Sequence, residues 1–220
     1  MLQKHAQITV EKATVKFVKE EEGMGVLING NLILTAAHCI DCNCEGDMAV
    51  GRDFIEDIES ANGEKLRISP IVVEPVIDIA ILGSLDNQVF FEEADRFEMF
   101  CENTKPVILS RDEFELGYSF PVYLLTHKRK WLIGKAMKHQ RNSPLILIEF
   151  NEKIESGTSG GPVINEAGEL IGILSQTSES SNEPNKCTAI APLPHLALPV
   201  WVCQRYFDPV SPYYKSSYDL

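Results

Sequence analysis

The chain has 220 residues with a formal net charge of −12 at pH 7, and 44% of its residues are apolar. A globular chain of this size buries about 70% of its unfolded surface and supports one or two compact cores. The acidic excess excludes nucleic acid and anionic membranes as expected partners, because phosphate binding requires a basic surface.

The first predicted elements are three strands that lead to a histidine. Alternating apolar and polar residues over 13–19, and apolar runs over 24–28 and 32–35, predict these strands. Residues 29–31, with the sequence Asn-Gly-Asn, are typical of a hairpin turn between the second and third strands. The third strand leads directly toward His38.

The next stretch completes a first antiparallel barrel. Residues 45–63 are polar and are expected to form an irregular surface excursion. Segments 65–74 and 76–82 predict consecutive strands, and the second of them carries Asp78 near its start. Residues 87–103 are rich in Glu and Phe and are expected to connect this barrel to a second half.

A second series of short apolar segments predicts another set of strands. They are 106–110, 121–126, 131–137, 145–150, 170–176 and 187–191. Many short strands with turn residues between them are typical of an all-β sandwich or barrel. The basic residues 128–130 lie between two of these segments and are expected to form a solvated hairpin tip.

A glycine-rich loop over 155–164, with the sequence ESGTSGGPVI, separates two of the predicted strands. Its composition places Ser159 at an exposed apex, because glycine permits positive φ and close approach of a ligand. The N–H groups of Gly157 and Ser159 are candidates for an oxyanion hole. The same residue types also form ordinary hairpin loops, so the loop alone leaves both interpretations open.

The chain order His38, Asp78, Ser159 is one of the orders in which the hydrolytic triad recurs. These stretches, within about residues 12–195, resemble the chymotrypsin/trypsin superfamily of serine proteases, in particular bacterial trypsin-like and HtrA-like peptidase domains. The resemblance implies an all-β fold of two six-stranded antiparallel barrels with a short C-terminal helix. It also implies a serine endopeptidase in which His38 is the base, Asp78 orients it and Ser159 is the nucleophile.

The resemblance divides the chain into four parts. They are a leader over 1–12, a barrel and linker with His38 and Asp78 over 13–100, a barrel with Ser159 over 101–207, and a tail over 208–220. Three prolines between residues 191 and 200 confine the C-terminal helix to about 200–207. No PDZ-like domain is expected, in contrast to full-length HtrA proteins.

Two departures from secreted relatives concern activation and disulfides. Thr158 stands where secreted trypsin-like enzymes carry the Asp that pairs with a newly cleaved N-terminus, so activation by that ion pair is excluded. Cys39 lacks its usual disulfide partner, because Gly23 occupies the corresponding position. With no signal peptide and no apolar run long enough for a membrane span, we expect a cytoplasmic protein with reduced cysteines.

A zinc site is the alternative role for the cysteine cluster. Cys39, Cys42 and Cys44 lie close together and, with Cys101, supply enough ligands. Because this is a single cluster and His38 is assigned elsewhere, we expect a plain loop, no metal and no cofactor.

By resemblance, the specificity pocket is formed by residues before the nucleophile loop and by two strand segments. These residues are Lys153, Ile154, Ser175, Gln176, Thr177, Thr188 and Ile190. Lys153 occupies the trypsin-type Asp position, which disfavours cleavage after Lys or Arg. Thr177 and Thr188 would narrow the pocket, so we predict small or medium apolar side chains. An acidic side chain attracted by Lys153 is the alternative, although Leu174 stands where glutamate-specific relatives use His.

Protein or peptide substrates are therefore expected. Two alternatives remain at this point. The first is a catalytically silent scaffold or binding module, suggested by the missing activation ion pair and the acidic composition. The second is a protease that needs an activating protein partner to order its oxyanion loop.

Overall fold

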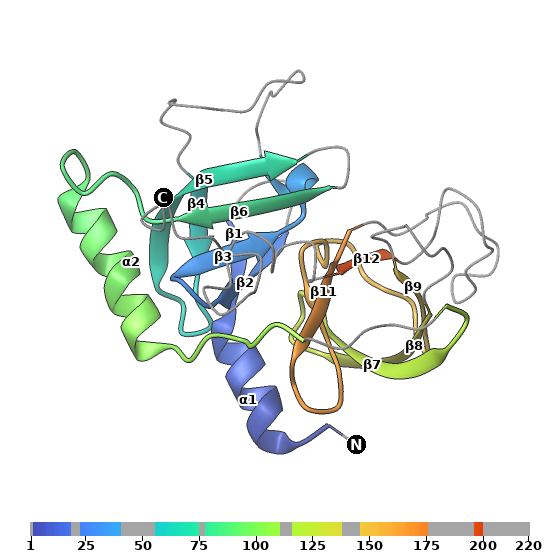
Figure 1. Cartoon of the computed structure of the whole chain (residues 1–220). Coiled ribbons are helices and arrows are strands. Elements are labelled where there is room, and N and C mark those ends of the chain that lie inside the picture. The colour runs from blue at the N-terminus through green and yellow to red at the C-terminus, as the bar shows by residue number, and fades with distance from the viewer. Residues whose placement is uncertain are drawn as a thin grey trace, which may run out of the picture.

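A computed structural model describes residues 2–18, 23–40, 56–74, 78–110, 116–137, 146–175 and 196–199. It contains two closed six-stranded barrels that lie side by side (Figure 1). Among these described residues, two α-helices accompany the barrels: α1 (Lys4–Ala13) precedes the first barrel, and α2 (Phe91–Asn103) follows it.

The first barrel has the strand order β1-β2-β3-β6-β5-β4, with every neighbouring pair antiparallel. Its strands are β1 (Thr14–Phe17), β2 (Met24–Ile28), β3 (Leu32–Thr35), β4 (Glu56–Glu59), β5 (Lys65–Glu74) and β6 (Ile79–Gly83). The strands predicted over 24–28, 32–35 and 65–74 are confirmed. β4 lies in the polar stretch expected to be irregular, and its Ile58 is fully buried.

The second barrel has the order β10-β11-β12-β9-β8-β7 and closes through pairing of β10 with β7. Its strands are β7 (Ser119–Leu125), β8 (Trp131–Met137), β9 (Ile146–Phe150), β10 (Pro162–Ile164), β11 (Leu170–Leu174) and β12 (Leu196–Pro199). The short strand β12 was not among the predicted segments. The expected C-terminal helix over 200–207 and the predicted strand over 187–191 lie outside the described residues.

The two helices correct the all-β expectation. Residues 4–13 of the expected leader form α1, and its Val10 and Ala13 are buried. The expected connection over 87–103 contains α2, which buries Phe97 and Phe100. The buried residues of α2 recur at the three- and four-residue spacing of an amphipathic helix, a signal that the linker interpretation overlooked. Neither helix is long and apolar enough to cross a membrane, nor is any other helix in the described ranges.

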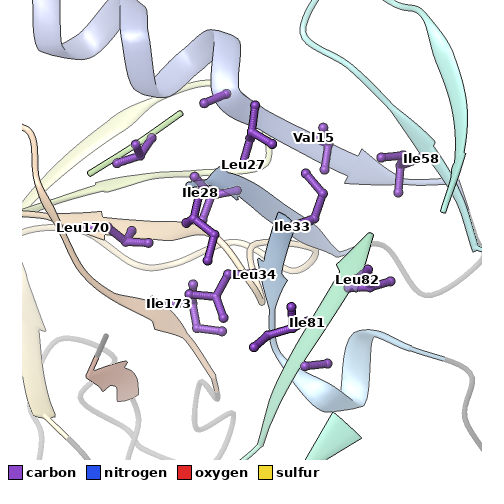
Figure 2. Close-up of a cluster of buried hydrophobic side chains, with 14 of the residues drawn as sticks. Val15, Leu27, Ile28, Ile33, Leu34, Ile58, Ile81, Leu82, Leu170 and Ile173 are labelled. Atoms are coloured by element: carbon purple, nitrogen blue, oxygen red, sulfur yellow. The ribbon is translucent and has the colours of Figure 1, made fainter. Parts of the chain in front are cut away.

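A continuous apolar core joins the two barrels. Figure 2 shows Ile28 and Leu34 of the first barrel beside Leu170 and Ile173 of the second, and all four are buried. The connecting segment makes parallel bridges to both barrels, one of which pairs Val107 with Ile28. Because the barrels share this buried surface, loops from each are held in one relative position.

Candidate active site

The ends of two neighbouring strands position His38 and Asp78. β3 and β6 pair with Thr35 opposite Ala80. His38 lies in the short 3-10 helix η1 (Ala37–Cys39) that follows β3, and Asp78 directly precedes β6. Because the chain leaves β3 at the edge where it enters β6, the strand register brings the two side chains together.

His38 and Asp78 make a direct side-chain contact. Nδ1 of His38 lies 2.8 Å from Oδ2 and 3.0 Å from Oδ1 of Asp78, and the backbone N–H of His38 donates to Oδ1 over 2.9 Å. Asp78 has a φ of 57°, in the left-handed region that a residue with a Cβ rarely adopts. The His38 side chain remains 47% exposed, so a substrate can reach the imidazole.

The pair is strongly polarised. The hydrogen bond with Asp78, and then the Cys39 thiol, raise the pKa of His38 from 6.5 to about 10 against the opposing effect of burial. Burial raises the pKa of Asp78, but hydrogen bonds from His38 and Ser175 outweigh it and lower this pKa below its usual value. The contact with Asp78 therefore favours the protonated form of the imidazole beside an ionised carboxylate.

Ser175 is a further member of this network, a role that the sequence did not predict. It follows β11 directly, is buried, and its Oγ donates a hydrogen bond to Oδ2 of Asp78. The place of Ser175 in the specificity pocket, which the family resemblance implies, stays a prediction. The sequence signal for this role is that a polar residue, Ser175, directly follows the apolar strand 170–174, because a buried polar group needs a hydrogen-bond partner.

The loop that carries Ser159 docks on both barrels. The N–H of Met24 in β2 donates to the Ser159 carbonyl over 2.7 Å, and the N–H of Gly160 donates to the Leu174 carbonyl over 2.7 Å. Gly160 has a φ of 75°, and a Cβ there would lie 1.9 Å from the Met24 carbonyl oxygen, so only glycine fits. Thr35, just before η1, donates to that same oxygen over 2.6 Å. The Ser159 loop thus docks on β2 and against Thr35 of β3, the strand that leads into the turn with His38.

The candidate oxyanion hole has donors available. Gly157 is buried with a φ of 82°, a conformation that favours glycine. Within the described ranges, no hydrogen bond uses the N–H of Gly157 or of Ser159 as donor. Among the described residues, both N–H groups thus have no protein acceptor, as the donors of an oxyanion hole require.

The remaining predicted site residues divide into three groups. Lys153 is exposed, whereas Ile154 is buried in the hydrophobic core of the second barrel. The pocket residues Gln176, Thr177, Thr188 and Ile190 lie outside the described residues, as do Cys42 and Cys44. Cys39 and Cys101 are buried free thiols, and burial raises the pKa of Cys101 to about 12.

The family model of the trypsin-like peptidase domain matches residues 23–173. The chain belongs to this family. No curated protein sequence matches the chain. Solved structures do resemble this peptidase domain in fold.

One of them is the serine endoprotease from Yersinia pestis, with 16% identity and a TM-score of 0.58 over 92% of this chain and 64% of that one. The active form of the Rv3671c protease from M. tuberculosis has 14% identity and a TM-score of 0.60 over 94% of this chain and 86% of that one. The HtrA-type protease AlgW with a tripeptide has 18% identity and a TM-score of 0.59. The match covers 93% of this chain and 62% of AlgW, so the peptidase domain here spans less than two thirds of two of these proteins.

Proposed function

We propose that the protein is a serine endopeptidase that cleaves peptide bonds through an acyl-enzyme. His38 is the general base, Asp78 orients it, and Ser159 is the nucleophile. The observation that carries the proposal is the bidentate contact between His38 and Asp78, in a trypsin-like peptidase domain whose Ser159 loop docks on β2 of the barrel that holds this pair.

In the acylation step, Ser159 Oγ attacks the scissile carbonyl carbon while its proton passes to the imidazole of His38. A serine hydroxyl is a weak nucleophile and needs this neighbouring base. Asp78 accepts from Nδ1–H and stabilises the imidazolium that forms. The imidazolium then donates its proton to the leaving amine as the tetrahedral intermediate collapses.

The N–H groups of Gly157 and Ser159 stabilise the oxyanion of that intermediate. Loss of one such donor typically costs a factor of about 10² to 10³ in rate. In the second half of the reaction, water activated by His38 hydrolyses the acyl-enzyme and restores the Ser159 hydroxyl. The substrates we propose are proteins or peptides with a small or medium apolar residue before the cleaved bond.

Activation requires no ion pair to a newly cleaved N-terminus. The support is Thr158, a neutral and buried residue at the position before the nucleophile. No carboxylate is available there to bind a positively charged amine.

A fluorophosphonate probe tests the assignment directly, because it reacts with an activated serine. We expect the wild type to be labelled and Ser159→Ala to be unlabelled. Ser156→Ala is the matched control, since it removes a hydroxyl from the same loop, and it should label at the wild-type rate. Mass spectrometry of a cleaved peptide library then defines the residue before the scissile bond.

The other outcomes separate the alternatives. Labelling of Ser159→Ala at the wild-type rate would exclude Ser159 as the nucleophile. Labelling of the wild type only in cell lysate would replace an autonomous protease with a partner-activated one. If the wild type stays unlabelled in lysate as well, the protein is a binding module and the proposal fails.

A further inference from the structure

Thr158, the residue before the proposed nucleophile, connects the nucleophile loop to a neighbouring turn. Thr158 is buried, and its Oγ1 accepts a hydrogen bond from the backbone N–H of His127 over 3.4 Å. Its carbonyl accepts from the N–H of Gly161 over 2.9 Å. The side-chain contact reaches out of the nucleophile loop to the turn between β7 and β8.

That turn, residues 126–130, is a closed hydrogen-bonded unit. The N–H of Thr126 donates to the Lys130 carbonyl, and the N–H of Arg129 donates to the Thr126 carbonyl, both over 2.8 Å. The buried Thr126 hydroxyl also accepts from the Lys130 N–H over 3.1 Å. Because His127 lies inside this unit, its N–H cannot move far without the rest of the turn.

Arg129 ties the turn to α1. Its Nη1 donates to the Glu11 carbonyl over 2.7 Å, and its Nη2 donates to the Thr14 carbonyl over 3.3 Å. These carbonyls belong to the last turn and the C-cap of α1, where backbone acceptors lack helical partners and a cation is favourable. Arg129 adopts a φ of 62°, a conformation more usual for glycine or asparagine. The basic hairpin tip over 128–130 was expected to be solvated, but its Arg129 contacts the end of α1.

Further contacts hold α1 against the second barrel. Trp131 Nε1 donates to the Glu11 carboxylate over 2.7 Å. Gly168 approaches α1 so closely that a Cβ there would lie 2.6 Å from the Ala6 Cβ. On the other side of the turn, Lys128 Nζ donates to the Glu155 carboxylate over 2.9 Å, at the start of the Ser159 loop. The turn thus lies between α1 and the nucleophile loop and contacts both.

We propose that α1 orders the nucleophile loop through Arg129 and His127, in place of the activating ion pair that Thr158 excludes. This inference rests on the proposed peptidase function. Arg129 and Thr158 are positioning residues: Arg129 holds the turn against the end of α1, and the turn holds Thr158 and hence the adjacent N–H of Ser159. A partner that displaced α1 would lower the activity, so α1 is also a route for regulation.

Hydrogen exchange tests, without any activity measurement, whether Arg129 orders the contact between His127 and Thr158. The His127 amide is the reporter, because its partner is the Thr158 hydroxyl. Thr158→Val removes that acceptor at nearly constant size, and we expect it to speed exchange of this amide about tenfold. Arg129→Ala should speed the same amide by a similar factor, although residue 129 does not touch it. An unchanged His127 amide in Arg129→Ala would overturn the proposal.

Steady-state kinetics test whether this order of the nucleophile loop supports catalysis. Arg129→Ala and Thr158→Val should each lower kcat about 10- to 100-fold with KM nearly unchanged, because a loosened oxyanion loop loses transition-state binding. Thr158→Ser keeps the acceptor and should return kcat to within about threefold of the wild type. The double variant should be no slower than the slower single variant, because both substitutions interrupt one path. If the fold losses of kcat in the two single variants multiply in the double variant, the residues act independently and the proposal fails.

Arg67→Ala is the matched control. Arg67 lies in β5, away from the turn over 126–130, and pairs with Asp57 of β4 and Glu93 of α2, so its removal should leave kcat within about twofold. If Arg129→Ala does not fold, Arg129→Lys and Trp131→Phe carry the same test, since each weakens the contact with α1. Failure of the peptidase function would appear as an unlabelled wild type, whereas failure of this inference would leave a labelled wild type and an unaffected Arg129 variant.

Discussion

The two halves of the candidate site are held in different ways. His38 and Asp78 come from adjacent strand ends of one barrel and bind each other through charge. Ser159 comes from a loop of the other barrel, and backbone hydrogen bonds to Met24 and Leu174 hold this loop in place. The first half depends on electrostatics, and the second depends on backbone shape. Substitutions that change only charge or only shape should therefore affect different halves.

Asp78→Asn changes charge with little change of shape, and it should have the largest effect. Removing the carboxylate leaves the imidazole in the wrong tautomer, and we expect kcat/KM to fall about 10⁴-fold. The pKa of His38 should fall as well, because the hydrogen bond with Asp78 is the largest cause of its elevation. Steady-state kinetics and an NMR titration of the His38 ring measure the two effects. A variant that keeps more than about a tenth of the activity would show that this pair is not catalytic.

The pH dependence of kcat/KM should be the next largest effect. With a pKa of about 10, His38 is protonated below that pH and cannot accept the Ser159 proton. The kcat/KM should therefore rise about tenfold per pH unit from neutral pH toward about 10. A plateau already reached at neutral pH would contradict this polarised resting pair. In Asp78→Asn the rise should move to lower pH.

The same pair predicts the pH dependence of stability. Because the folded pKa of His38 lies above its ordinary 6.5, the stabilisation is complete below 6.5 and is lost as the pH rises through about 10. The lowered pKa of Asp78 has the opposite sign, and its contribution is lost at acid pH. Chemical denaturation across this pH range measures both contributions to the free energy of unfolding. Asp78→Asn is the reference, because it lacks the pair and its stability should not vary with pH in this way.

Gly160→Ala changes shape with no change of charge and should have the smallest of these effects on activity. Its Cβ would lie 1.9 Å from the Met24 carbonyl oxygen, so the loop must shift away from β2. A displacement of this kind costs about 10²-fold in kcat/KM. Gly63→Ala is the matched control, because Gly63 has a similar φ of 81° but open space around it. Equal activity of the two variants would show that docking on β2 is irrelevant.

Several elements were predictable because their signals are local. β2, β3, β5 and β8 coincide with the predicted apolar segments, and the motif around His38 led to its pairing with Asp78. β4 was not predictable in this way, since its four residues are mostly acidic and its partners β1 and β5 define it as a strand. Helix α2 carried a helical signal, but the composition of 87–103 predicted only a connection between the two halves.

The sequence by itself determined most strands of the two barrels, with β4 and β12 among the exceptions, and the residue types of the candidate site, because apolar periodicity and motif spacing are properties of near neighbours. Only the tertiary structure decided which polar groups meet across elements. Ser175 reaches Asp78 because two barrels close against each other, and Arg129 is partly buried because α1 packs beside its turn. Such contacts join residues far apart in the chain, and their hydrogen bonds depend on packing that no local pattern records.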